Sequence, residues 1–295
     1  MNETNINNEH KDRLFTFIFG DKGNKAWTLS LYNAVNGTSH TDENDIEITT
    51  MSDIIYMNMK NDVSFLVSDI LNLYEQQSTY NPNMPVRLLM YLGRQYDRYI
   101  KLTGQNPYGT KCMTLPIPKF IAFYNGKSDK PDEILELKDS FPPDMDKNLS
   151  DVQVKVQLIN INPGHNTELL AACKPLSEYS WFVDTIRKKQ TVKSMKIAEA
   201  INSTIDEMPS DFEIRKFLIA NRAEVTNMCL TEYNEEETMK LFKEEGREEG
   251  REEGRKETSL QNIRTLMKNL QFSAEQAMDS LNISPDEQKK YISML

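Results

Sequence analysis

Three polar residues flank a short apolar stretch of the chain, in the sequence NDVSFLVSDILNLYEQQST. Asp62 precedes the first apolar run, and Glu75 and Gln77 end the second. Two carboxylates that lie close together can share one Mg²⁺ ion, which proteins hold through one or two carboxylates together with a substrate phosphate. Such an ion polarises a phosphodiester and acidifies a bound water. These residue types therefore predict phosphodiester hydrolysis, provided that the fold brings them together.

The two apolar runs can pair as an antiparallel hairpin that turns at residues 68–69. Directly opposed residues in such a hairpin lie equally far from the turn, so Asp62 faces Glu75. Side chains two positions apart on a strand share a face, so Gln77 joins the two carboxylates while Gln76 points away. Like charges placed this close repel unless something positive lies between them. The pairing is compatible with a site in which Asp62 and Glu75 bind the metal and Gln77 completes the catalytic set. Acidic and polar residues are also common at strand ends, so an ordinary hairpin with a polar rim is the alternative.

A cationic group beside the carboxylates would steady the charge that develops on phosphorus. Gln77 can hydrogen-bond a water but carries no charge. Apolar residues recur at helical spacing from 82 to 104, and a second stripe beside them consists of Arg87, Tyr91, Arg94 and Arg98. Arg87 and Arg94 are the candidates for this electrostatic role, and all three arginines are candidates for binding DNA. The alternative is that these long side chains only border the apolar face.

The charge distribution is compatible with a nucleic-acid partner despite a net charge of −10. Residues 81–130 contain eight basic and two acidic side chains. Residues 235–257 contain ten glutamates against six basic side chains. Much of the acidity therefore lies far from the predicted site, whereas a basic segment follows it directly.

Cysteine and histidine chemistry is not expected. The cysteines are far apart, without the spacing of a zinc site or of a disulfide framework, and the histidines have no nearby partners at metal-ligand spacing. No run approaches the roughly 18 apolar residues that a membrane span needs. The N-terminus is polar and has no apolar signal core, so we expect a cytoplasmic protein with no membrane partner.

Hydrophobic periodicity predicts an α/β fold with a mixed sheet flanked by helices, followed by an all-helical C-terminal region. Two short helices are expected in residues 11–36, ending at Gly37. Consecutive antiparallel strands are expected from DIEITT, DIIYMNMK and DVSFLV, and further strands from LPIPKFIAFYNG and VQVKVQLININP. Pro116 and Pro118 should delay pairing of the first of these two until about Lys119.

The C-terminal third is expected to be helical and highly charged. An EEGR repeat predicts a solvated helix or spacer, and Ser273 with Gln276 forms a capping box that opens a short helical tail. We therefore divide the chain into a core at 1–205, a helical region with the charged spacer at 206–258, and a tail at 259–295. A tail this short needs a partner surface, which is compatible with a homo-oligomer formed through the C-terminal helices.

Several ordered segments resemble one known family. The runs NDVSFLV, LNLYEQQSTYNPNMPVRLLMYLGRQYDRYI, LPIPKFIAFYNG, VKVQLININPGHN and LLAACKPLSEYSWFVDTIRK, the EEGR repeat and the tail EQAMDSLNISPDEQKKY resemble the PD-(D/E)xK nuclease family transposases, also called Rpn-like recombination-promoting nucleases. This resemblance implies a restriction-endonuclease-like core and Mg²⁺-dependent cleavage of DNA. Asp62 and Glu75 match the two acidic motif positions, and Gln77 stands where the signature Lys would be.

Three functions are compatible with these observations. The first is a Mg²⁺-dependent DNA endonuclease associated with recombination or mobile elements. The second is a catalytically silent protein of the same fold that binds DNA or a protein through the basic helix. The third is a scaffold whose C-terminal helices mediate oligomerisation. The presence of both Asp62 and Glu75 favours the first, whereas Gln77 and the acidic total charge weigh against it.

Overall fold

The computed structural model describes residues 14–50, 62–283, 288 and 291–292. The chain divides into two compact units, Met1–Tyr233 and Asn234–Leu295. Helix α8 (Arg222–Leu270) begins in the first unit and ends in the second. The predicted strand DIIYMNMK falls in residues 51–61 and so lies outside the described residues.

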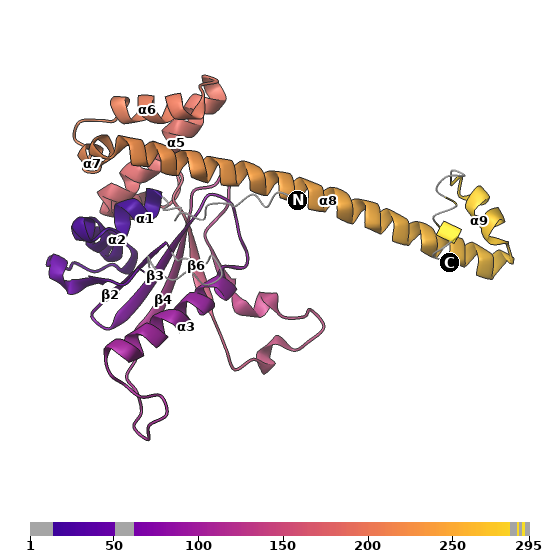
Figure 1. Cartoon of the computed structure of the whole chain (residues 1–295), viewed down its shortest axis with the longest axis horizontal. Helices are drawn as coiled ribbons and strands as arrows, with labels where there is room; N and C mark the ends of the chain where they lie inside the picture. Colours follow the sequence, from indigo (N-terminus) through magenta and orange to yellow (C-terminus); the bar gives the residue numbers. More distant parts are fainter. Residues whose placement is uncertain (1–13, 51–61, 284–287, 289–290, 293–295) are drawn as a thin grey trace, which may run out of the picture. The chain divides into compact units, whose positions relative to one another are not determined.

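The first unit is built around a mixed sheet, as predicted (Figure 1). Over the described residues the sheet has six strands in the order β1-β2-β3-β4-β6-β5. Strand β2 is antiparallel to both of its neighbours, β1 and β3. Strands β3, β4 and β6 run parallel, and β5 is antiparallel to β6. The bounds are β1 Ile46–Ile48, β2 Val63–Val67, β3 Ile70–Gln77, β4 Ile117–Tyr124, β5 Glu133–Glu136 and β6 Lys155–Asn160. Strand β5 was not predicted.

The hairpin between β2 and β3 has the predicted register. Leu66 pairs with Leu71 and Ser64 with Leu73, which places the turn at residues 68–69. Both turn residues have positive φ values, 45° for the serine and 62° for the aspartate. Turns with two left-handed central residues match the right-handed twist of the flanking strands, which favours a two-residue connection here.

The prediction that prolines delay pairing of β4 was wrong. Pairing with β3 begins at Ile117, whose N–H donates to the Asp69 carbonyl at 2.8 Å. Successive residues of a strand point their N–H groups to opposite neighbours, so Pro118 lacks a donor only on the β6 side. Pairing with β6 starts later, at Ile121. The proline therefore lies on a part of the strand edge that β6 does not reach.

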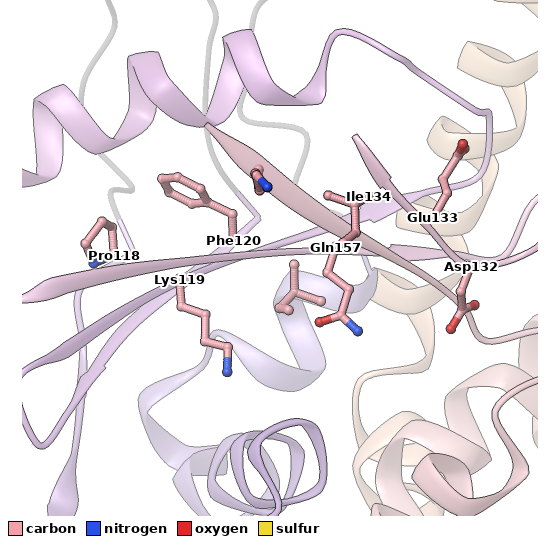
Figure 2. A pocket seen from close by; sticks show the side chains of 9 residues that line it. Pro118, Lys119, Phe120, Asp132, Glu133, Ile134 and Gln157 are labelled. Carbon is pink, nitrogen blue, oxygen red and sulfur yellow. The ribbon is translucent and has the colours of Figure 1, made fainter. Parts of the chain in front are cut away.

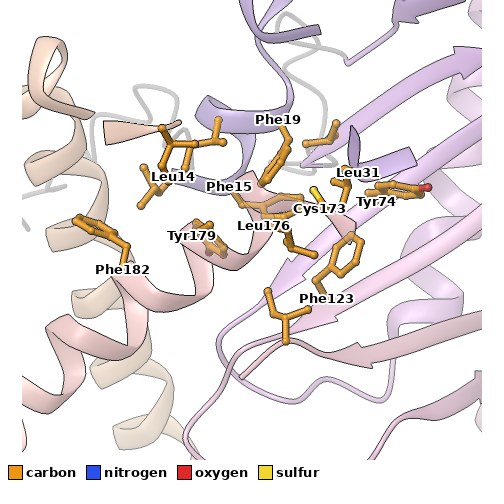
Figure 3. Packing of buried hydrophobic residues seen from close by; sticks show 14 of the residues in the cluster. Leu14, Phe15, Phe19, Leu31, Tyr74, Phe123, Cys173, Leu176, Tyr179 and Phe182 are labelled. Atoms are coloured by element: carbon orange, nitrogen blue, oxygen red, sulfur yellow. The ribbon is translucent and has the colours of Figure 1, made fainter. Parts of the chain in front are cut away.

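The larger hydrophobic core lies between one face of the sheet and several helices (Figure 3). Phe65, Tyr74 and Phe123 of the sheet belong to this core together with residues of α1 and α5. The contributing helices are α1 (Leu14–Phe19), α2 (Lys25–Asn36), α5 (Lys174–Val192), α6 (Ile197–Glu207) and α7 (Arg215–Ala220), and α4 (Thr167–Ala172) packs beside them. Gly37 ends α2 with a φ of 64°, as predicted. Val225 of α8 also belongs to this core, which therefore extends into residues that follow α7.

The opposite face of the sheet is covered by α3 (Met84–Leu102), as Figure 1 shows. Leu71 and Leu73 of β3 form a second core with Leu88 of α3 and Leu158 of β6. Every second residue of β3, counted from Leu73, points to this face, and these residues include Glu75 and Gln77. The helix that carries the arginine stripe therefore packs on the same face as the predicted site.

The second unit is helical in its described residues, which confirms the all-helical C-terminal region. Ile263 of α8 packs with Ala277 and Met278 of α9 (Ala274–Ser280). Ser273 caps α9 through the predicted capping box. No helix among the described residues is both long and apolar enough to cross a membrane.

Candidate active site

Asp62 and Glu75 are joined across the hairpin by two hydrogen bonds. The Asp62 N–H donates to Oε1 of Glu75 at 2.9 Å, and the Gln76 N–H donates to Oδ2 of Asp62 at 2.7 Å. Asp62 is 7% exposed and Glu75 is 0% exposed. Burial of an acidic group is costly unless its charge is hydrogen-bonded or paired. The local structure therefore brings the two predicted metal ligands together and fixes both of them by backbone N–H groups.

Arg87 contacts this pair directly. Its Nη2 donates to Oε2 of Glu75 at 3.1 Å and to the Tyr91 hydroxyl at 3.2 Å. Desolvation opposes the charge of the guanidinium, but Glu75, Tyr91 and Asp62 outweigh it and raise the pKa of Arg87. Desolvation, reinforced by Glu75, also raises the pKa of Tyr91. Arg87, which the sequence suggested for electrostatic help or DNA binding, is thus an ion-pair partner of the buried carboxylate.

Gln77 lies at the end of β3 with an unsatisfied donor. Its side chain is buried, and Oε1 accepts a hydrogen bond from the Asn81 N–H at 3.2 Å. This bond fixes the orientation of the amide, because a reversed amide would set two donors against each other. Nε2 then has no hydrogen-bond partner among the described residues. A buried unpaired donor costs about 1–3 kcal/mol, so its presence needs an explanation.

The other two arginines of the stripe lie further along α3. Arg98 is exposed at its surface, and its Nη1 donates to the Thr49 carbonyl at 3.1 Å. Arg94 is partly buried. Between them, Gln95 donates to the Ser64 hydroxyl at 2.7 Å and to the Thr49 carbonyl at 3.2 Å. These bonds hold α3 against β2 and against the residue that follows β1.

The donor set fits a hard divalent cation only in part. No cluster of three or more His, Cys, Asp or Glu side chains is placed to hold a metal among the described residues. Two carboxylates with a nearby amide are nevertheless the kind of set that Mg²⁺ uses when waters and substrate phosphate complete its shell. Both Glu75 oxygens already accept a hydrogen bond. An ion at Oε2 would therefore have to displace the Arg87 guanidinium.

Tyr91, which contacts Arg87, was placed in the predicted stripe but not among the site residues. Asn81, which contacts Gln77, was not singled out. Tyr91 lies within the arginine stripe, four residues after Arg87, so its place on the same helix face could be read from the spacing. The Asn81 contact is made by a backbone N–H, for which residue type gives no signal.

A hollow of about 520 Å³ lies elsewhere on the sheet (Figure 2). Its lining includes Lys119, Asp132, Glu133 and Gln157, from β4, β5, β6 and the segment before β5. Figure 2 shows Lys119 and Gln157 pointing to the same side of the sheet and Phe120 to the other. The lining contains neither of the paired carboxylates, so this hollow is separate from the candidate site.

Comparisons with known proteins add no further evidence, since no family model, no curated protein and no solved structure matches the chain.

Proposed function

We propose that the protein is a Mg²⁺-dependent DNA endonuclease that hydrolyses phosphodiester bonds. The observation that carries this proposal is the pair of buried carboxylates, Asp62 and Glu75, joined across one hairpin. The resemblance to PD-(D/E)xK nuclease family transposases supports the same activity and suggests a role in recombination or mobile elements. DNA is the expected substrate because the basic stripe of α3 lies on the same face of the sheet.

Each of these residues has a proposed role in the reaction. Asp62 and Glu75 would supply the oxygen ligands of the ion, which would polarise the phosphate and acidify a water. Gln77 would donate the unpaired N–H of Nε2 to that water or to a phosphate oxygen. Arg87, released from Glu75, would supply the positive charge that an amide lacks. Arg94 and Arg98 would bind the DNA backbone.

A second candidate is a catalytically silent protein of the same fold that binds DNA or another protein. The observation that favours it is the ion pair between Arg87 and Glu75, whose N and O atoms lie 3.1 Å apart. A guanidinium in this position neutralises the carboxylate without a metal. In this case α3 would still bind DNA, but the site would not cleave it.

Plasmid nicking separates the two candidates. The purified protein should nick supercoiled plasmid with Mg²⁺ and lose this activity in EDTA. Glu75→Gln keeps the shape of the side chain but removes its charge, and it should reduce nicking by about 10²-fold or more. Glu47→Gln, at an exposed position of β1, is the matched control and should nick normally. DNA binding without nicking would favour the silent protein, and cleavage in EDTA would exclude the metal mechanism.

A further inference from the structure

Asn125 is a buried residue in which every polar group makes a hydrogen bond. It follows β4 directly, and its side chain is 2% exposed. Its N–H donates to the Gln77 carbonyl at 3.0 Å, and its carbonyl accepts from Nη1 of Arg187. Its Oδ1 accepts from Nε2 of Gln76 at 2.7 Å, and its Nδ2 donates to the Tyr179 hydroxyl at 3.3 Å. The partners belong to β3 and to α5.

Gln76 connects Asn125 to the carboxylates through the thickness of the sheet. Its side chain points away from the site, as predicted, and ends on Asn125. Its backbone N–H, however, donates to Oδ2 of Asp62. Any movement of Gln76 therefore moves a hydrogen bond that holds one of the two proposed metal ligands.

Gln77 is fixed by the same residue. The bond from the Asn125 N–H to the Gln77 carbonyl continues the pairing of β3 with β4 beyond the last strand residue. Asn125 thus holds both residues that follow Glu75, one through its side chain and the other through its backbone. A catalytic group must be held to within a fraction of an ångström by its surroundings.

Helix α5 anchors this arrangement from the other face of the sheet. Tyr179 is 1% exposed and packs in the larger core (Figure 3). Its burial raises the pKa of its hydroxyl well above the ordinary value, so it remains a neutral hydrogen-bond partner. Arg187, two helical turns further on, holds the Asn125 backbone. The end of β4 therefore cannot shift without breaking contacts with α5.

From this chain of contacts we infer that Asn125 is a positioning residue of the proposed nuclease site, through which α5 fixes Asp62 and Gln77 from the opposite face of the sheet. The inference rests on the proposed function for its effect on catalysis. Its structural part, that Asn125 immobilises Gln76, stands independently of any cleavage. Asn125 itself touches neither substrate nor metal.

The test combines hydrogen exchange with nicking kinetics on the full-length chain. Asn125→Leu removes both side-chain hydrogen bonds at similar volume. The backbone N–H of Gln76 should exchange about tenfold faster than in the wild type, because local opening around this residue becomes easier. The kcat for plasmid nicking should fall about tenfold or more with little change in KM, because the site is misplaced while DNA contacts remain.

Asn160→Leu is the matched control. Asn160 ends the neighbouring strand β6 and is 1% exposed. Its N–H, Nδ2 and Oδ1 all make hydrogen bonds, but with residues outside the proposed site. This variant should leave both Gln76 exchange and kcat unchanged. Asn125→Asp retains an acceptor for Gln76 and should recover most of the kcat. If Asn125→Leu does not fold, Tyr179→Phe can be used instead, because it removes the hydrogen bond between Asn125 and the Tyr179 hydroxyl. It should change Gln76 exchange and kcat in the same direction but by less.

Two results would overturn the inference. The first is unchanged Gln76 exchange in Asn125→Leu or, where that variant does not fold, in Tyr179→Phe. The second is an equal loss of kcat in Asn125→Leu and in Asn160→Leu. A wild-type protein that does not nick DNA would refute the proposed function instead, and the exchange measurement would still decide whether Asn125 holds Gln76.

Discussion

The ion pair between Arg87 and Glu75 makes a quantitative prediction about stability. Arg87→Met keeps the aliphatic contacts of the side chain and removes its charge. Glu75, which is fully buried, then loses the guanidinium that donates to Oε2. The variant should therefore be less stable than the wild type at neutral pH, and a divalent cation should restore stability to it.

The size of the loss follows from the contacts that remain. Breaking a buried ion pair by removing one partner costs about 3–5 kcal/mol. Here the Asp62 N–H still donates to Oε1 of Glu75, and the Arg87 side chain is 30% exposed, so water can replace part of the lost interaction. We therefore expect a loss of about 2–3 kcal/mol in the free energy of unfolding. Mg²⁺ at about 100 times its Kd would return about 2.7 kcal/mol.

Urea unfolding followed by tryptophan fluorescence measures this effect. Both tryptophans, Trp27 and Trp181, pack against the larger core of the first unit, so their emission reports its unfolding. Arg98→Met is the control on the same helix, because it removes only a bond to a carbonyl at an exposed position and should cost less than about 1 kcal/mol. An Arg87→Met variant within about 0.5 kcal/mol of the wild type would refute the reasoning. So would equal stabilisation of both proteins by Mg²⁺, because the guanidinium would then not compete with the ion.

Three further substitutions test individual features. Gln77→Met removes the buried unpaired Nε2, and it also removes the hydrogen bond that Oε1 accepts from a backbone N–H. The free energy of unfolding, measured in urea, should therefore change little or rise by up to about 1 kcal/mol. Plasmid nicking should be lost. Gly126→Ala would place a Cβ 2.6 Å from the Ser78 carbonyl oxygen and against a tyrosine hydroxyl, so thermal unfolding should show a loss of about 1–3 kcal/mol. Burial raises the pKa of Glu178, whose carboxylate accepts two backbone N–H groups at the start of α7. A raised pKa means that the folded protein binds the proton more tightly than the unfolded chain, so the free energy of unfolding should fall as pH rises from the ordinary pKa of 4.5 through the raised one. Glu178→Gln should flatten this part of the stability profile. A free energy of unfolding that rises over this pH range would contradict the prediction.

The hairpin of the site could be predicted from the sequence because its determinants are local. A two-residue turn at Ser68 and Asp69 fixes the pairing, and the alternation of faces along β3 then places Glu75 and Gln77 on one side. Asp62 directly precedes β2 and is joined to Glu75 by a hydrogen bond. The mixed sheet followed by helices could likewise be read from the change of hydrophobic period. The pairing within the hairpin, and the change of period, depend on residues that are close together in the sequence.

The contacts that decide the chemistry could not be predicted in the same way. The stripe on α3 was recognised, but only the packing of the helix on β3 determines that Arg87 reaches Glu75 while Arg98 reaches the Thr49 carbonyl. The role of Asn125 depends on a strand 49 residues away and on a helix 54 residues further along the chain. No local pattern carries such information, because these contacts arise from tertiary packing.

In the proposed nuclease site, Gln77 stands where the resemblance implies a lysine, and the geometry around Arg87 is consistent with a glutamine there. A lysine at this position would add a second cation beside Glu75 and Asp62, where a guanidinium already neutralises one carboxylate. With two cations beside two carboxylates, the site would have no net negative charge to attract a metal ion. With glutamine, two carboxylates face one arginine, and the remaining negative charge favours a divalent ion, which on binding could release Arg87 toward the phosphate. Arg87 and Gln77 together would then replace the single lysine, so that Gln77→Lys combined with Arg87→Met should retain more nicking activity than Gln77→Lys alone. Equal or lower activity in the double variant would show that the arginine does not take over the charge of the missing lysine.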